Sequence, residues 1–283
     1  MVDEGLVDEE GTGDVECTSK WKIKTGQLVR CGVCMSCRIT RTEEWAMRIE
    51  HECHGKEGCF ITLTYRDDPI TLNKRDLQLF FKRLRRRLDV PIKYYACGEY
   101  GDLNSRPHYH AIIIGWRPMD LLKTGKNYRS KMIEELWPFG FNVVGSIDPK
   151  SIRYVTGYIR KKLYGHAAAE YGDRLPPFSL MSVGIGKEYA LNNAERLSKN
   201  LMQTRNGKTV GLPRYYKELY DRDGAQVTSR VRWSTKLSRV KKVKEYLDSD
   251  RTYSEFVEDE QSDLSRRRRH IDARSTLTKK GKL

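Results

Sequence analysis

The stretch "IKYYACGEYGDLNSRPHYHAIIIG", residues 92–115, contains two apolar runs separated by a polar segment. The runs at 92–101 and 108–115 are rich in aromatic and β-branched residues, which favour strands. The segment between them, "GDLNSRP", is rich in residues that favour turns. This order predicts an antiparallel hairpin.

The second run of this hairpin begins with a pair of histidines. Side chains alternate across a strand, so His108 and His110 are expected on the same face as Ile112 and Ile114. The opposite face is then formed by residues 109, 111 and 113.

Glu99 stands near the end of the first run, and the hairpin is expected to bring it beside His108 and His110. Two imidazoles and a carboxylate leave open positions on a divalent ion, as a catalytic metal site requires. The alternatives are a structural histidine pair and a surface carboxylate near Arg106.

Strand and helix patterns continue on both sides of the hairpin. The order β, α, β, β, α, β, α predicts an α+β fold, a split βαβ antiparallel sheet of the ferredoxin or RRM type with helices on one face. A further helix is expected at 40–54, with Thr40 as its N-cap. The strands other than the hairpin are expected at 59–65 and 141–147, and the helices at 73–89, 129–137 and 151–165.

The rest of the chain divides by composition. Residues 1–16 form an acidic, Gly-rich segment that is expected to be disordered. A cysteine-bearing segment, 17–58, precedes the predicted sheet domain, 59–170. A mostly helical accessory region, 171–260, and a basic tail, 261–283, are expected to follow.

The charge of the chain points to nucleic acid. Its 53 Lys and Arg outnumber 38 Asp and Glu, for a net charge of +15, and much of the excess lies in short runs such as "KRLRRRL" at 82–88. Dense positive charge together with 16 tyrosines and 5 tryptophans favours a phosphate polyanion with bases to stack on. The alternative is a set of solvated helix faces.

No apolar run approaches the roughly 20 residues of a membrane span, and the acidic N-terminus is unlike a secretory signal. We therefore expect a cytoplasmic protein, in a bacterial host, with no membrane partner.

The chain has 7 cysteines, an odd number that does not favour a disulfide framework. Cys31, Cys34 and Cys37 follow CxxCxxC spacing, and Cys17 offers a fourth thiolate for a tetrahedral structural zinc. The alternative is a set of reduced, partly buried thiols.

The helix expected at 151–165 carries a pair of tyrosines. Tyr154 and Tyr158 are four residues apart and share one helical face, and Lys161 follows Tyr158 by one turn. Such pairs are commonly core and rim residues, but beside a metal they suggest chemistry. A phenol with a pKa near 10 is a poor nucleophile unless an ion polarises the phosphate or a cation such as Lys161 stabilises developing charge. Together these residues suggest a phosphodiester transesterification site.

The motifs resemble the HUH endonuclease superfamily, and within it the rolling-circle replication initiators of the microviruses, in particular gokushovirus-like ones. "FITLTY" resembles the family's first motif, and "RPHYH" resembles its histidine, hydrophobic, histidine motif. "GEYG" lies where these initiators tend to hold an acidic third ligand, and "CGVCMSCR" is similar to a cysteine cluster near the start of the phage proteins.

The resemblance implies a metal-dependent enzyme, with Mg²⁺ or Mn²⁺ as cofactor, that nicks and rejoins origin DNA through a 5′-phosphotyrosine link. Implied partners are single-stranded and origin DNA and the host helicase and polymerase, and no G-x-x-x-x-G-K-[ST] motif of a built-in helicase is present.

"YVTGYIRKK" resembles the motif of the two-tyrosine initiators, but Gly157 stands where members commonly have lysine. We therefore expect Tyr158, with Lys161 after it, to make the first attack and Tyr154 the second. The alternatives are a plasmid or transposon HUH nuclease, a non-catalytic nucleic-acid-binding protein, and a zinc-dependent module.

Overall fold

The computed structural model describes residues 16–101, 105–161, 163, 165–205 and 208–279. The predicted acidic segment therefore lies outside the described residues, apart from Glu16. The chain forms two compact units, one of residues 41–193 and one of residues 1–40 together with 194–283. The predicted sheet domain, 59–170, lies within the first unit.

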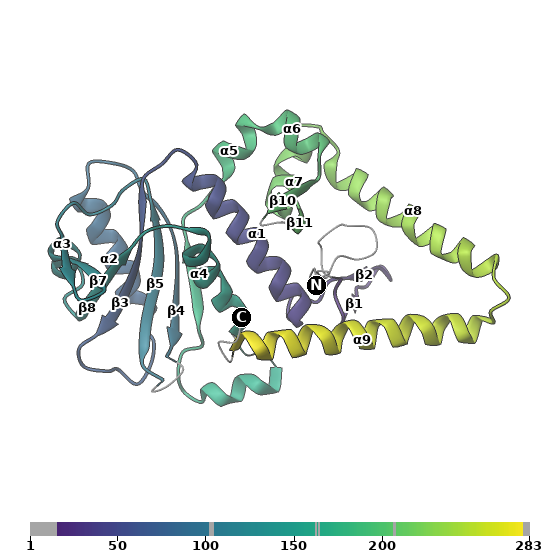
Figure 1. Ribbon diagram of the computed structural model, residues 1–283, viewed down its shortest axis with the longest axis horizontal. Helices are drawn as coiled ribbons and strands as arrows, with labels where there is room; N and C mark the ends of the chain where they lie inside the picture. Colours follow the sequence, from purple (N-terminus) through teal and green to yellow (C-terminus); the bar gives the residue numbers. More distant parts are fainter. Residues whose placement is uncertain (1–15, 102–104, 162, 164, 206–207, 280–283) are drawn as a thin grey trace. The chain divides into compact units, whose positions relative to one another are not determined.

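The first unit is built on a seven-stranded antiparallel sheet (Figure 1). Across the sheet the strand order is β6-β7-β8-β3-β5-β4-β9. Because β5 lies between β3 and β4, the connection from β3 to β4 is a split βαβ unit. The strands are β3 (Gly58–Tyr65), β4 (Lys93–Tyr100), β5 (Pro107–Ile114), β6 (Leu121–Thr124), β7 (Asn127–Ser130), β8 (Gly140–Gly145) and β9 (Phe178–Met181).

Helices α2 (Lys74–Arg87) and α3 (Lys131–Leu136) pack on one face of this sheet. Asn73 caps α2, since its side chain accepts a hydrogen bond from the Arg75 N–H. The apolar residues of α2 recur at helical spacing and are all buried against strand residues such as Tyr109 and Ile113. The buried residues of α2 are Leu77, Phe80, Phe81 and Leu84.

Helices α1 (Met35–Cys53) and α4 (Pro149–Lys161) contribute to a second core, on the opposite face. There Ile112 and Ile114 of β5 are almost completely buried. The α+β class and the antiparallel sheet are confirmed. The predicted placement of helices on one face describes only α2 and α3, because the apolar residues of β5 that face the other way also require cover.

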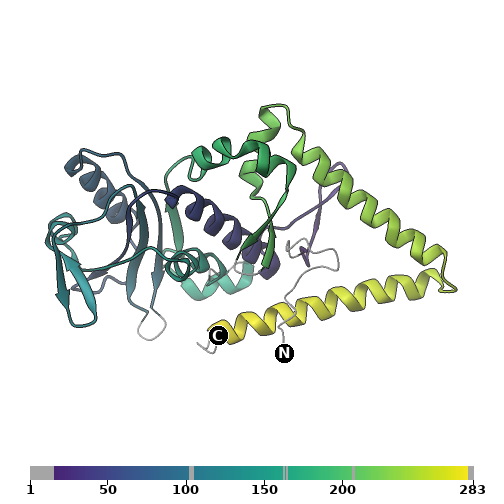
Figure 2. The same cartoon turned by 45° about the horizontal axis from the view of Figure 1, so that its top comes forward.

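The element boundaries show three further differences from the sequence-based expectations. Helix α1 begins at Met35, so Thr40 is an internal residue whose hydroxyl donates to the Ser36 carbonyl at 3.1 Å. The hairpin of β6 and β7 and the edge strand β9 were not expected (Figure 2). Helix α3 is correspondingly short, since Ser130 ends β7 and serves as the N-cap of the helix.

Two short elements follow α4 in the first unit, the 3₁₀ helix η1 (Gly165–Tyr171) and α5 (Lys187–Asn192). The second unit holds two small antiparallel pairs, β1 (Trp21–Lys22) with β2 (Leu28–Val29) and β10 (Met202–Arg205) with β11 (Lys208–Gly211). Its helices are α6 (Ala194–Lys199), α7 (Arg214–Arg222), α8 (Val227–Leu247) and α9 (Tyr253–Lys279).

The predicted helical C-terminal region is thus present, and the predicted basic tail is helical as far as Lys279. Within the described part of the chain, no helix has the length and apolar character needed to cross a membrane.

Candidate active site

The hairpin of β4 and β5 brings Glu99 and the two histidines together. In its register Glu99 lies opposite His108. The Glu99 Oε1 atom is 2.9 Å from Nε2 of His108 and 3.6 Å from Nε2 of His110. One ligand atom from each of the three residues lies within 4.8 Å of the others. The juxtaposition predicted from the sequence is therefore present in the structure.

Hydrogen bonds orient both imidazoles. Nδ1 of His108 is 2.9 Å from the Arg106 carbonyl oxygen. A carbonyl oxygen can only accept, so this Nδ1 carries a proton and Nε2 is left to face Glu99. Nδ1 of His110 is 2.9 Å from the Thr62 hydroxyl, which the pairing of β3 with β5 places directly opposite.

The three side chains fit a divalent cation. Glu99 and His110 are each 4% exposed, so little water reaches the carboxylate. A neutral His108 and an ionised Glu99 would direct lone pairs at each other across 2.9 Å, which requires a proton or a cation beside them. Two neighbouring ligands of an octahedral ion with bonds of about 2.1 Å are about 3.0 Å apart, close to this separation.

The tyrosine pair reaches the same site from α4. The helix begins with a reciprocal cap in which Asp148 Oδ1 accepts from the Ser151 N–H at 2.7 Å and Ser151 Oγ accepts from the Asp148 N–H at 2.9 Å. Ile152 and Val155 are buried against the sheet, and this packing fixes which side of the helix faces the histidines.

Tyr154 and Tyr158 differ in exposure. Tyr154 is 50% exposed, and its hydroxyl lies 3.4 Å from Nε2 of His110. Tyr158 is 4% exposed, and its ring is nearly parallel to the His110 ring, with centroids 5.3 Å apart. Burial raises the pKa of the Tyr158 phenol, and the negative charge of Glu99 raises it further.

Two other predicted features lie at different distances from this site. Lys161 is the last residue of α4, but its side chain lies outside the described part of the chain, so its role stays a prediction. The four predicted zinc ligands Cys17, Cys31, Cys34 and Cys37 do come together, in a separate cluster.

The basic run at 82–88 belongs to α2, on the sheet face opposite the histidines. Some of its arginines make intramolecular contacts, since Arg83 Nε donates to the Leu136 carbonyl at 3.0 Å and the Arg85 guanidinium lies 5.0 Å from the centre of the Tyr94 ring. Contact of this run with DNA stays a prediction.

Sequence reasoning did not single out Thr62 or Phe60. Thr62 contacts Nδ1 of His110, and the Phe60 ring is stacked 5.7 Å from the same imidazole, centre to centre. Both belong to "FITLTY", whose alternation indicates a strand but not its register. The register against β5 would have been needed to find them.

Comparison with known proteins agrees with this arrangement. The model of the family described as "Replication-associated protein ORF2" matches residues 58–163, which contain the three candidate ligands and both tyrosines. The "Replication-associated protein ORF2" of Spiroplasma virus 4 is 31% identical over 264 residues, covering 84% of this chain and 82% of the relative. The chain belongs to this family.

Two further members of the replication-associated family are similar. The "Replication-associated protein VP4" of Bdellovibrio phage phiMH2K is 32% identical, over 75% of this chain and 74% of the relative. The "Replication-associated protein ORF4" of Chlamydia phage 1 is 30% identical, over 67% of this chain and 52% of the relative. No solved structure matches the chain. The resemblance to microvirus replication initiators is confirmed by these relatives.

Proposed function

We propose that this replication-associated protein starts phage DNA replication as a metal-dependent tyrosine endonuclease that nicks and rejoins one strand at the origin. The observation that carries the proposal is the position of the Tyr154 hydroxyl, half-exposed and 3.4 Å from a histidine of the three-ligand cluster. A nucleophile beside a cation site is the arrangement that phosphodiester cleavage requires.

Glu99, His108 and His110 would hold the divalent cation, Mg²⁺ or Mn²⁺. Bound there, the ion would supply Lewis-acid polarisation of the scissile phosphate. The Arg106 carbonyl and the Thr62 hydroxyl keep the two imidazoles oriented for that task. The burial of Glu99 strengthens the electrostatic attraction between its carboxylate and a cation.

The reaction is a transesterification at phosphorus. The Tyr154 oxygen forms a bond to phosphorus while the bond to the 3′ oxygen breaks, and the phenolic proton passes to solvent. The product is a 5′-phosphotyrosine and a strand that ends in a 3′ hydroxyl, which a host polymerase can extend. Attack by a 3′ hydroxyl on the phosphotyrosine reverses the exchange and closes the strand without ATP, because one phosphate ester replaces another.

Accessibility favours Tyr154 for the first attack and Tyr158 for the second. DNA can reach a hydroxyl on a half-exposed ring, whereas the Tyr158 ring lies under it against His110. This order is the reverse of the one that Lys161 suggested from the sequence. A second tyrosine permits another cleavage while the first link is still in place.

Origin DNA is the proposed substrate, and the host helicase and polymerase are the proposed partners. Membership in a family of phage replication-associated proteins supports this assignment. The basic surface would supply affinity for phosphates without regard to sequence.

The test uses the full-length protein, a single-stranded origin oligonucleotide and Mn²⁺. We expect a protein–DNA adduct that survives denaturation, requires the cation and is absent from a Tyr154→Phe/Tyr158→Phe double variant. An adduct that forms equally well with the double variant would refute the assignment. Tight DNA binding without any adduct would instead favour a non-catalytic binding protein.

A further inference from the structure

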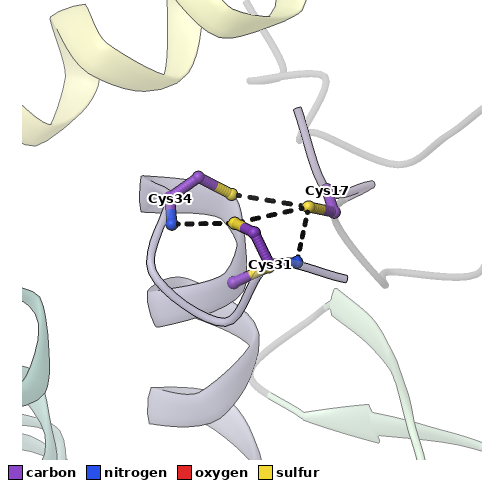
Figure 3. Close-up of side chains that lie close together, drawn as sticks. Cys17, Cys31 and Cys34 are labelled. Atoms are coloured by element: carbon purple, nitrogen blue, oxygen red, sulfur yellow. Dashed lines mark hydrogen bonds between the residues drawn. The ribbon is translucent and has the colours of Figure 1, made fainter. Parts of the chain in front are cut away.

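Four cysteines of the second unit gather in one cluster that the proposed nuclease chemistry does not use. Cys17 and Cys31 lie on either side of the β1–β2 pair, while Cys34 and Cys37 lie at the start of α1 (Figure 3). Cys17, Cys31 and Cys37 are buried, at 2–6% exposure, and Cys34 is partly exposed. Residues far apart in the sequence therefore bring four sulfurs to one place.

The sulfur positions fit neither a disulfide nor an ordinary apolar core. Sγ of Cys17 is 3.7 Å from Sγ of Cys31 and 3.8 Å from Sγ of Cys34, and all four sulfurs lie within 4.8 Å of one another. A disulfide would require about 2.05 Å. Four sulfurs at the corners of a tetrahedron with bonds of about 2.3 Å to a central zinc are about 3.8 Å apart.

We propose that Cys17, Cys31, Cys34 and Cys37 bind a structural zinc ion. Four thiolates fill a tetrahedral shell, so the ion has no open position for substrate, unlike a catalytic site. Zinc is also favoured over Mg²⁺ by soft sulfur ligands, so the two proposed metal sites take different ions.

Backbone N–H groups already point at the sulfurs. The Cys31 N–H donates to Sγ of Cys17 and the Cys34 N–H to Sγ of Cys31, each at 3.3 Å (Figure 3). Such hydrogen bonds stabilise thiolates and fix the orientation of metal ligands. The backbone conformation at Gly32, with φ +76°, supports the tight turn between Cys31 and Cys34 and strains any other residue type there.

The ion would fix the first turn of α1 to the segment before it. The same helix continues to Thr42, whose hydroxyl donates to the Thr156 carbonyl of the tyrosine helix at 3.4 Å. Further along, Ala46 and Ile49 are buried in the core that contains Tyr158. Loss of zinc should therefore lower stability more strongly than it alters the chemistry at Glu99, His108 and His110.

The first test measures metal in the full-length protein, expressed in medium containing zinc and purified without a metal-affinity step. We expect about one zinc per chain, released when a mercurial reagent titrates about four thiols. Cobalt substitution should give the visible spectrum of a tetrahedral thiolate site. Folded wild-type protein that holds iron instead, or holds well under one equivalent of any metal and gives no such spectrum, would overturn the proposal.

Variants separate this cluster from the histidine site. Cys17→Ser and Cys31→Ser should lose most of the zinc, whereas Cys53→Ser, at the far end of α1, should keep it. A His108→Ala/His110→Ala double variant should also keep about one zinc per chain. Zinc lost from the histidine variant but retained by Cys17→Ser would place the metal elsewhere. The result does not depend on nuclease activity, so it stands or fails separately from the proposed function.

Discussion

The Tyr154 hydroxyl lies 3.4 Å from Nε2 of His110, although the two residues are 44 positions apart in the sequence. β5 supplies the imidazole and α4 supplies the phenol, and the packing of α4 on the sheet sets the distance between them. On the same helix face, the Tyr158 ring centre lies 5.0 Å from that of Tyr154 but is buried. The two phenols therefore differ in access to a substrate rather than in their neighbours.

The tyrosine variants test this difference. Tyr154→Phe is expected to slow first-strand nicking by about 100-fold or more, because it removes the accessible nucleophile. Tyr158→Phe should leave the first nick within about threefold of wild type but block the second transfer that closes a circle. Single-turnover adduct formation gives the rates, and mass spectrometry of the linked peptide identifies the tyrosine. A first-cleavage adduct found only on Tyr158 would restore the order suggested by the sequence.

The histidine variants separate chemistry from binding. His108→Ala and His110→Ala should each abolish cleavage while DNA affinity stays within about threefold of wild type, since affinity comes mainly from basic side chains and chemistry from the cation. Gel-shift titration and adduct formation are measured on the same preparations. Parallel loss of both activities in a folded variant would count against the metal site.

Much of the fold, and the members of the site, could be predicted from the sequence. Alternation in "HYHAIIIG" correctly assigned the face of each β5 residue, and Glu99 was correctly placed beside the histidines because a hairpin register follows from its turn. The long-range relations could not be predicted in this way. Which helix covers which face, and the exposure of Tyr154 against Tyr158, depend on packing between elements distant in the chain.

Thr62 illustrates a residue that only the structure identifies, and it supplies a test. Thr62→Val removes the hydroxyl that contacts Nδ1 of His110 while keeping a β-branched side chain. Loss of such an orienting contact typically weakens metal affinity about 10- to 100-fold. We expect cleavage to need correspondingly more Mn²⁺ and to recover at saturating Mn²⁺.

The matched control is Thr64→Val. Thr64 lies two residues along the same strand, and its hydroxyl makes a long 3.5 Å contact to the Phe141 carbonyl. Its Mn²⁺ requirement should match that of wild type. Equal shifts in the two variants would show that Thr62 acts through the strand and not through His110.

Gly157 lies in the middle of α4, between the two tyrosines, where its backbone freedom destabilises the helix. An added Cβ would contact only the flexible end of the Arg160 side chain, at 3.4 Å. Gly157→Ala is therefore expected to raise the free energy of unfolding by about 0.5–1 kcal/mol, measured by urea denaturation. Gly115→Ala is the contrasting variant and should destabilise the protein, because Gly115 has φ +96° and its Cβ would lie 2.9 Å from the Pro91 carbonyl oxygen. A destabilising effect of Gly157→Ala would mean that α4 requires the glycine for a reason other than helix propensity.

Glu52 provides the pH dependence of stability. It is 3% exposed, and its carboxylate accepts hydrogen bonds from Lys56 and Lys93 at 2.8 Å each and from the Gly186 N–H at 2.7 Å. Burial raises the pKa of this carboxyl, but the three donors lower it by more, so the pKa lies below its usual value of 4.5. A folded-state pKa below that of the unfolded chain stabilises the protein above pH 4.5, and this contribution is lost as the pH falls through the folded-state pKa.

Glu52→Gln keeps the shape of the side chain but removes its charge. We expect the free energy of unfolding to fall by about 1–3 kcal/mol at pH 7, because charged hydrogen bonds are weakened and one amide group meets donors instead of acceptors. The difference from wild type should shrink as both proteins are measured at successively lower pH below 4.5, where the wild-type carboxyl also becomes neutral. Glu188→Gln is the control, since Glu188 pairs with the same Lys56 at 2.9 Å but its side chain is 65% exposed, and its loss should cost under about 1 kcal/mol. A constant difference between wild type and Glu52→Gln across this pH range would show that the charge of Glu52 does not contribute to folding.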